Sequence, residues 1–408
     1  MKCSQSILAT NTSKGMTTVV ESKKQEMESQ SKDEKDLIQQ FERRELPHDL
    51  IIEMILTRLP IKSILRFKSV SKLWYSTLCS SLFAFAHLKF PNPSPTESLL
   101  IRNGKRFQIM SYENGEIDLV NVEVDFDVGD ENMDLVGTCN GLVCLGSSSG
   151  RLSIIWNPIT RKFHKYWDFE ISNSFTSRCL VYWGFGYVSI VDDYKIVRVC
   201  KNMDNDSLTV HVCSIRLDTW RIIKNDAYDD TSHLRNPVFI RISGALVNET
   251  LYWGLPGTNF SFNLASEKLE AFPYLETSPS LSYVTTSDDE YVDKLLFVVN
   301  GCLSMYGTLV KGGDIITFMN ILTIMKSPEV IEQMIVPKDL AKSMHHGGNL
   351  IGFTRSDKIF TQYMACLGVI DLTRQPLNIT PLMDLERSGK SEIVNYCASL
   401  IPPNISVL

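Results

Sequence analysis

The sequence predicts an α+β protein with a small N-terminal three-helix unit followed by a mainly antiparallel β domain. Two observations support this fold class. Apolar residues recur at helical spacing between Leu46 and Phe90, whereas from Leu99 onward apolar runs of strand length alternate with turns rich in Gly, Asn, Asp and Ser. The 408 residues are enough for two or more domains with a sizeable core.

The segment before the helices, residues 1–40, is rich in Ser, Lys, Glu and Gln and has almost no aromatic residues. Such a segment cannot bury enough apolar surface to offset the entropy of ordering it. We therefore expect a disordered N-terminal tail, with the helical domain over residues 41–90.

The first predicted helix has about three turns, because Ile51, Ile55 and Leu59 recur at a spacing of four. Pro60 ends this helix and starts a second short one, since proline is tolerated in a first turn but not inside a helix. A third helix follows from about Val70, with Ser69 or Ser71 as its N-cap.

The helical unit contains more apolar surface than it can bury, and Leu82, Phe83, Phe85, Ala86 and Leu88 extend that surface further. One interpretation is that these residues only pack on one another. However, a bundle of this size rarely stabilises itself through its own core. We therefore predict a protein partner that covers the surplus surface.

Residues 91–98 contain three prolines at alternate positions, which predicts a stiff connector or an ordinary loop. The β domain over residues 99–408 shows a loose repeat of strand, polar turn and exit strand. Its units are Asn140–Cys144 with Ile155–Lys162, Val212–Arg221, Ser261–Lys268 and Gly368–Arg374. This spacing predicts a β-propeller-like arrangement, with a sandwich or a split pair of sheets as the alternative. Residues 328–340 are expected to hold at most a short turn of helix.

The net charge, the apolar runs and the cysteines of the sequence limit the possible partners and the cellular compartment. The formal net charge of −6 argues against nucleic acid as a partner, and no apolar run is long enough to suggest a membrane span. The ten cysteines contain no Cys-x-x-Cys pair, so we expect buried free thiols rather than disulfides or zinc ligands. The expected location is the cytoplasm, the nucleus or both.

Candidate catalytic and metal-binding motifs have simpler structural explanations. Gly146–Gly150 fits the pattern of a nucleophile elbow, but strands on both sides predict a hairpin turn. His345 and His346 have no third ligand at a matching spacing. The acidic pairs at 192–193 and 288–290 fall where charged turns are expected. We predict no catalytic residue, no metal and no cofactor.

The helical unit resembles the F-box of plant F-box proteins, through Leu46-Pro47, Leu50-Ile51 and the run from Arg58 to Trp74. His48 and Ser69 stand where an acidic residue and a cysteine are common. The resemblance implies docking onto the Skp-type adaptor of a cullin-RING ubiquitin ligase. The contact residues implied are Leu46, Pro47, Leu50, Ile51, Leu59, Pro60, Leu65, Val70 and Trp74.

The β domain resembles the kelch-like F-box-associated interaction domain, through Asn140–Cys144, Trp156–Lys162, Gly184–Tyr187 and Asp218–Arg221. Val188 replaces a common aspartate, and the closing strand near Tyr396 lacks a common glutamate. The resemblance implies a non-catalytic substrate-recognition adaptor of an SCF-type (Skp-cullin-F-box) ubiquitin ligase in the protein degradation pathway. The alternatives are an F-box interaction protein that acts outside ubiquitin ligation and a β-propeller enzyme.

The target protein and the residues that bind it are unknown from the sequence. The candidate rim stretches are 147–150, 226–232 and 343–348.

Overall fold

The computed structural model divides the chain into two compact units, the first ending at Arg58 and the second beginning at Leu59. The described residues are 50–90, 97–113, 115–128, 132–168, 179–202, 208–223, 243–255, 258–272, 290–299, 302–311, 314–324, 328–336, 349–353, 358–363, 365–371, 379–385 and 391–404. The predicted tail, most of the proline connector, Leu46 and Pro47 therefore lie outside the described residues.

The described part of the first unit is helical but not a regular α-helix. A π-helical segment, η1 (Ile51–Ile55), is followed directly by a 3₁₀ turn, η2 (Leu56–Arg58). The Thr57 hydroxyl donates to the Glu53 carbonyl at 2.6 Å, and such back-bonding disturbs regular helical hydrogen bonding. The tight last turn also suits Pro60, whose ring would clash with the Leu56 carbonyl in a continuous α-helix.

Three further helices follow, α3 (Ile61–Phe67), α4 (Lys72–Leu78) and α5 (Ser81–Lys89). Pro60 precedes α3 as predicted, and its carbonyl accepts from the amide of Ser63 at 2.8 Å. Of the two predicted N-caps of α4, the structure selects Ser71, whose hydroxyl accepts from the Trp74 amide at 3.1 Å. The apolar residues from Leu82 to Leu88 form a helix of their own, α5. Among the described residues, no helix is both long and apolar enough to cross a membrane.

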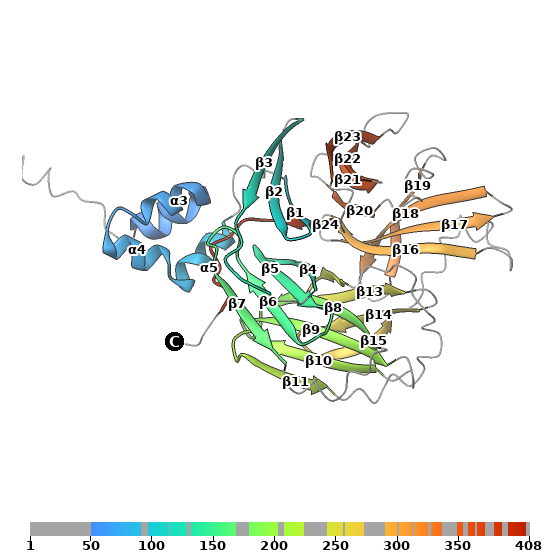
Figure 1. Ribbon diagram of the computed structural model, residues 1–408, viewed down its shortest axis with the longest axis horizontal. Helices are drawn as coiled ribbons and strands as arrows, with labels where there is room; N and C mark the ends of the chain where they lie inside the picture. Colours follow the sequence, from blue (N-terminus) through green and yellow to red (C-terminus); the bar gives the residue numbers. More distant parts are fainter. Residues whose placement is uncertain are drawn as a thin grey trace, which may run out of the picture. The chain divides into compact units, whose positions relative to one another are not determined.

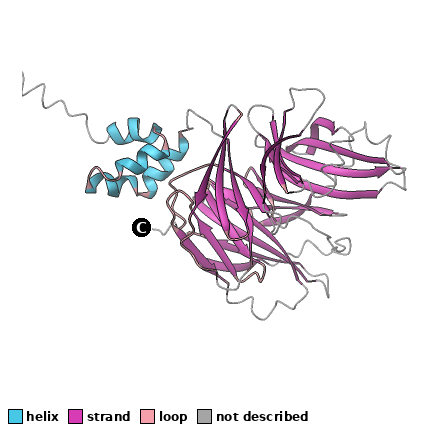
Figure 2. Ribbon diagram, turned by 45° about the horizontal axis from the view of Figure 1, so that its top comes forward, coloured by secondary structure: helices cyan, strands magenta, loops and turns pink. Residues whose placement is uncertain are grey.

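The described residues of the β domain form six four-stranded antiparallel sheets. Their strands are drawn in magenta in Figure 2. The first sheet has the order β24 (Ser391–Tyr396), β1 (Glu97–Asn103), β2 (Arg106–Glu113) and β3 (Glu116–Val122). The second and third sheets are β4 (Met133–Cys139), β5 (Leu142–Ser147), β6 (Leu152–Trp156) and β7 (Phe163–Trp167), and β8 (Cys179–Val188), β9 (Asp193–Asn202), β10 (Leu208–Ser214) and β11 (Thr219–Ile223).

The remaining three sheets have the same meander order. They are β12 (Ala245–Val247), β13 (Thr250–Leu255), β14 (Thr258–Asn263) and β15 (Lys268–Phe272); β16 (Glu290–Val299), β17 (Cys302–Lys311), β18 (Asp314–Ile324) and β19 (Pro328–Val336); and β20 (Asn349–Phe353), β21 (Lys358–Tyr363), β22 (Cys366–Asp371) and β23 (Ile379–Asp384). The expectation of at most a helical turn at 328–340 is wrong, because β19 occupies residues 328–336 and pairs with β18.

The inner strands of these sheets contact one another in a closed cycle, in the order β24, β4, β8, β12, β16, β20 and back to β24. Figure 1 labels most of the strands of the domain. The two ends of the domain meet in one sheet, where β24 pairs with β1 through Ser98 opposite Tyr396. β24, from the carboxyl-terminal end of the domain, therefore completes the first sheet. The prediction of a propeller-like domain is confirmed, and a sandwich does not describe it.

Adjacent sheets pack through tryptophans that lie against glycines. The buried ring of Trp183 in β8 covers Gly146 in β5 so closely that a Cβ on that glycine would lie 2.6 Å from the ring. At Gly184 in β8, a Cβ would lie 2.4 Å from the Leu251 side chain and 3.0 Å from the ring of Trp253, both in β13. The Trp253 indole N–H also donates to the Trp183 carbonyl at 3.0 Å. The second, third and fourth sheets are thereby interlocked.

Candidate functional site

The residues predicted to bind a partner in the second unit are accessible on a well-defined helical scaffold. Val70 is 60% exposed and Pro60 is also exposed, whereas Leu59, Leu65 and Trp74 are partly exposed. Trp74 is held by the ring of Phe67, whose centroid lies 5.8 Å away in an edge-on arrangement. The ring of His87 in α5 forms a hydrogen bond of 2.8 Å with the Leu59 carbonyl, which fixes the turn that presents Leu59 and Pro60.

In the first unit, the two predicted contact residues that the structure describes are also accessible. Leu50 is 47% exposed and Ile51 is partly exposed. The same segment exposes Met54 and Ile55, which the prediction did not include among the contacts. Partner proteins typically cover half-exposed apolar side chains of this kind on a short helix.

The contact set predicted from the sequence also omitted exposed apolar residues of the second unit. Leu73 and Tyr75 in α4 are 59% and 58% exposed, and Leu82 in α5 is 85% exposed. Their apolar character was visible in the sequence, but their exposure depends on which face of each helix packs on Ile64, Leu78 and Phe83. The assignment of individual contacts to a partner stays a prediction.

The candidate rim stretch 147–150 is a self-contained turn between β5 and β6. The Ser147 hydroxyl lies 3.0 Å from the Ser149 hydroxyl and accepts from the Leu152 amide at 3.0 Å. The predicted hairpin at the Gly-x-Ser-x-Gly sequence is therefore present, and no helix follows it. The other two rim stretches, 226–232 and 343–348, lie outside the described residues, as do Asp288 and Asp289.

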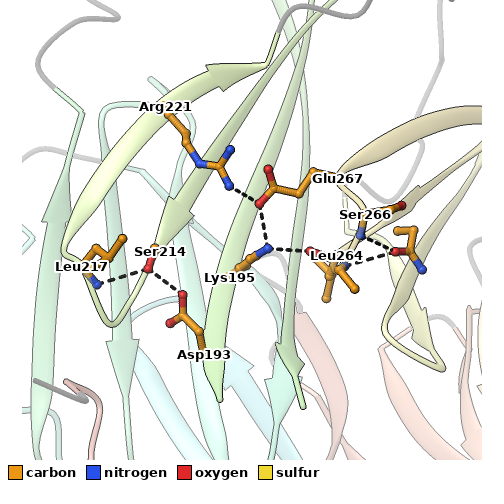
Figure 3. Close-up of polar contacts among 10 residues, drawn as sticks. Asp193, Lys195, Ser214, Leu217, Arg221, Leu264, Ser266 and Glu267 are labelled. Carbon is orange, nitrogen blue, oxygen red and sulfur yellow. Dashed lines mark hydrogen bonds and ion pairs between the residues drawn. The ribbon is translucent and has the colours of Figure 1, made fainter. Parts of the chain in front are cut away.

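The paired carboxylates at 192–193 hold turns in place. Asp193 accepts from the Ser214 hydroxyl at 2.5 Å and from the Arg216 amide at 2.9 Å. Ser214 in turn accepts from the Leu217 amide at 3.1 Å, which completes the β10–β11 turn (Figure 3). Asp192 accepts from the Tyr187 hydroxyl at 2.5 Å. Both carboxylates therefore have structural partners.

A second polar cluster joins the third sheet to the fourth (Figure 3). The Lys195 ammonium of β9 donates to the Leu264 carbonyl at 2.6 Å and to the Glu267 carboxylate at 2.7 Å. Arg221 of β11 donates to the same carboxylate. Glu267 takes a left-handed conformation at the β14–β15 turn, with φ of 56°. These charged contacts connect the third sheet with the fourth.

The most deeply buried charges lie between the second and third sheets. The Arg198 guanidinium of β9 is fully buried and donates to the Asp168 carboxylate and to the Gly150 carbonyl. Asp168 also lies 3.4 Å from Nδ1 of His211. Burial alone would raise the pKa of Asp168, but hydrogen bonds from His211 and Arg198 lower it to about 2. The carboxylate is therefore a fixed negative charge.

Asp168 and His211 could be two members of a hydrolase triad, but the nearby Cys213 thiol is unsuited to nucleophilic attack. Burial raises the pKa of the nearby Cys213 thiol far above its usual range, so the thiolate is not available. Among the described residues, no cluster of His, Cys, Asp and Glu is arranged to hold a metal ion. The polar groups of these sheets are explained by the packing of the fold.

Hydrogen bonds hold the carboxyl-terminal segment after β24 against the second sheet. The Asn157 amide donates to the Ser399 carbonyl at 3.1 Å and to the Ile401 carbonyl at 2.8 Å. The Ser399 hydroxyl donates to the Asn140 carbonyl at 2.5 Å. The Asn-Gly and Asn-Pro motifs of the sequence thus have a defined role in closing the domain.

Comparisons with known proteins follow this division of the chain. A family model described as the F-box domain matches residues 44–85, and one described as the F-box associated beta propeller domain matches residues 99–285. An F-box/kelch-repeat protein of Arabidopsis thaliana is 29% identical over 233 residues, which cover 54% of this chain and 62% of that protein.

Two further Arabidopsis thaliana proteins show similar relationships. One F-box protein is 33% identical over 162 residues, covering 38% of this chain and 37% of the relative. The F-box protein CPR1 is 26% identical over 285 residues, covering 64% of this chain and 66% of the relative. The matches with the first two relatives span 62% and 53% of those proteins' own length.

Proposed function

We propose that this chain, a plant F-box protein whose F-box is followed by an F-box-associated β-propeller domain, is the substrate-recognition subunit of an SCF-type ubiquitin ligase. The F-box binds the Skp-type adaptor, which connects it to the cullin and the RING protein. The β domain binds a target protein. The chain acts in the cytoplasm, the nucleus or both.

The observation that carries this proposal is the exposed apolar surface of the helical segments. Covering a side chain such as Val70 or Leu73 contributes at most about 1.5–3 kcal/mol, so a few of them yield a stable complex after the costs of association. The capped helices hold these residues in place before binding, which lowers the ordering cost.

The proposed mechanism is proximity and requires no chemistry from this chain. A target held by the β domain is brought near a ubiquitin-loaded enzyme that other subunits position, which raises the effective concentration of the target lysine. The chain itself is non-catalytic in this proposal. The interlocked sheets suit the role, because a rigid β domain presents the target in a fixed orientation.

The direct test is calorimetric titration of the full chain with a purified plant Skp-type adaptor. The double variant Leu59→Asp with Pro60→Ala should lose binding, because it places a charge at the turn that His87 holds. The matched control is Leu217→Asp, which changes an apolar residue that is 67% exposed in the β10–β11 turn. The control should bind normally. A wild-type chain that fails to bind the adaptor refutes the proposal.

Ubiquitin ligation is tested separately from adaptor binding. A protein that co-purifies with the chain should be lost from cells in a manner that requires the adaptor and the proteasome. If that protein binds but its abundance does not respond, the chain is an F-box interaction protein that acts outside ubiquitin ligation.

A further inference from the structure

β3 is the outermost strand of the first sheet in the part of the chain that the structure describes. It pairs with β2 on one side, and among the described residues no strand pairs with its other side (Figure 1). Such an edge presents a row of backbone N–H and C=O groups that can accept another strand. Five of the seven residues of β3 are exposed, so the strand is accessible on both faces of the sheet.

The uncharged half of β3 distinguishes it from the other outer strands. An edge is usually protected from pairing by a charged residue or a proline along its length. The other outer strands whose side chains are described contain such residues: Lys165 in β7, Arg221 in β11, Lys268 and Glu270 in β15, and Pro381 in β23. In β3 the charges are confined to Glu116 and Asp118, and Leu119–Val122 contains neither a charge nor a proline.

Two apolar rows cross the first sheet and end at this edge. One runs from Leu100 in β1 through Ile109 in β2 to Val120, and Leu100 is completely buried whereas Val120 is 50% exposed. The rows lie on opposite faces, because successive side chains of a strand alternate between faces. A fifth strand would continue each row.

The second row runs from Leu99 in β1 through Met110 in β2 to Leu119. Met110 is completely buried, whereas Leu119 is 41% exposed. On each face of the sheet, an apolar row that is buried in β1 therefore ends in a half-exposed side chain in β3.

We propose that the outer edge of β3 binds an extended segment of the target protein, which adds a fifth strand to the first sheet. This inference rests on the proposed role of the β domain in holding a target. Backbone hydrogen bonds supply affinity, and the alternate side chains of the added strand pack on Leu119 and Val120. The exposed carboxylates of Glu116 and Asp118 favour Lys or Arg in the part of the segment that lies beside them.

The proposal is tested by selecting a displayed library of random short peptides on the full chain and then measuring hydrogen exchange with the enriched peptide. The enriched sequences should alternate apolar residues and contain Lys or Arg at one end. The amides of β3 should become protected from exchange. Methylation of alternate backbone nitrogens in the peptide should abolish binding, because that change removes hydrogen bonds and keeps the side chains.

A matched pair of variants locates the site. Val120→Lys should weaken binding of the enriched peptide about tenfold or more, because a lysine on an edge strand disfavours pairing with a further strand. Ile222→Lys in β11 changes a residue that is also on an outer strand and is 51% exposed, and it should have no effect. Both variants should keep the stability of the parent chain.

Several results would overturn the inference. They are a selection with no enriched sequence, equal binding to the parent and to Val120→Lys, and protection confined to other strands. A Val120-dependent dimer in the absence of peptide would assign the edge to a second copy of this chain and also contradict the inference. None of these measurements includes the adaptor, so loss of adaptor binding would refute the proposed ligase function without bearing on β3.

Discussion

Replacing Asp168 by asparagine should destabilise the β domain more than any exposed charge change. Asp168 and Arg198 form a buried ion pair between the second and third sheets, with side chains 3% and 0% exposed. The substitution keeps the shape of the side chain and removes its charge, so Arg198 remains buried without a counter-charge. Breaking one half of a buried pair costs about 3–5 kcal/mol. We expect a loss near the lower end, because the Gly150 carbonyl still accepts from Arg198.

The lowered pKa of Asp168 makes the contribution of this carboxylate to stability depend on pH. Burial alone would raise the pKa, but hydrogen bonds from His211 and Arg198 lower it from 3.8 to about 2 on folding. Because the folded pKa is the lower one, this contribution is complete at pH values above the unfolded pKa and is lost as the pH falls through about 2. The stability difference between the parent and Asp168→Asn should therefore shrink below about pH 4.

Urea unfolding followed by tryptophan fluorescence measures both effects, because Trp220 lies 4.6 Å from the Arg198 guanidinium and reports on its surroundings. Asp218→Asn is the matched control, since Asp218 pairs with His164 at the surface and should change stability by less than about 0.5 kcal/mol. A loss below about 1 kcal/mol for Asp168→Asn, or a loss that does not change with pH, would refute the buried-pair reasoning.

Two further substitutions test how the sheets are joined. Gly146→Ala should destabilise the domain by about 1–3 kcal/mol in the same urea assay, because the new methyl group overlaps Trp183. Gly104→Ala, where a Cβ meets nothing within 4 Å, should cost only the strain of its positive φ, about 1 kcal/mol; equal losses would contradict the steric argument. Asn157→Ala removes two buried hydrogen bonds to the carboxyl-terminal segment and should make cleavage near Ile401 by a protease markedly faster, whereas unchanged cleavage would show that other contacts fasten the segment.

Features that depend on neighbouring residues could be predicted from the sequence. Proline at 60 dictates where one helix ends and the next begins, and Ser71 can cap α4 whatever the rest of the fold does. The strand-and-turn repeats likewise predicted a propeller-like domain, because each meander is built from local hairpins. The family resemblance identified both domains and the closing strand near Tyr396.

Features that depend on distant residues could not be predicted. Asp168, Arg198 and His211 meet across two sheets, and nothing in their local sequence marks them as partners. The irregular geometry of η1 was missed because apolar spacing alone does not separate an α-helix from a π-helix. The strand β19 was missed because residues 328–336 are recognised as a strand through their pairing with β18.

The central claim is that the helical segments bind a Skp-type adaptor, and calorimetric titration of the full chain with that purified adaptor tests it most directly. Our account predicts a one-to-one complex that Leu59→Asp with Pro60→Ala abolishes and that Leu217→Asp leaves unchanged. Absence of binding by the parent chain, or binding that the double variant retains, would contradict it.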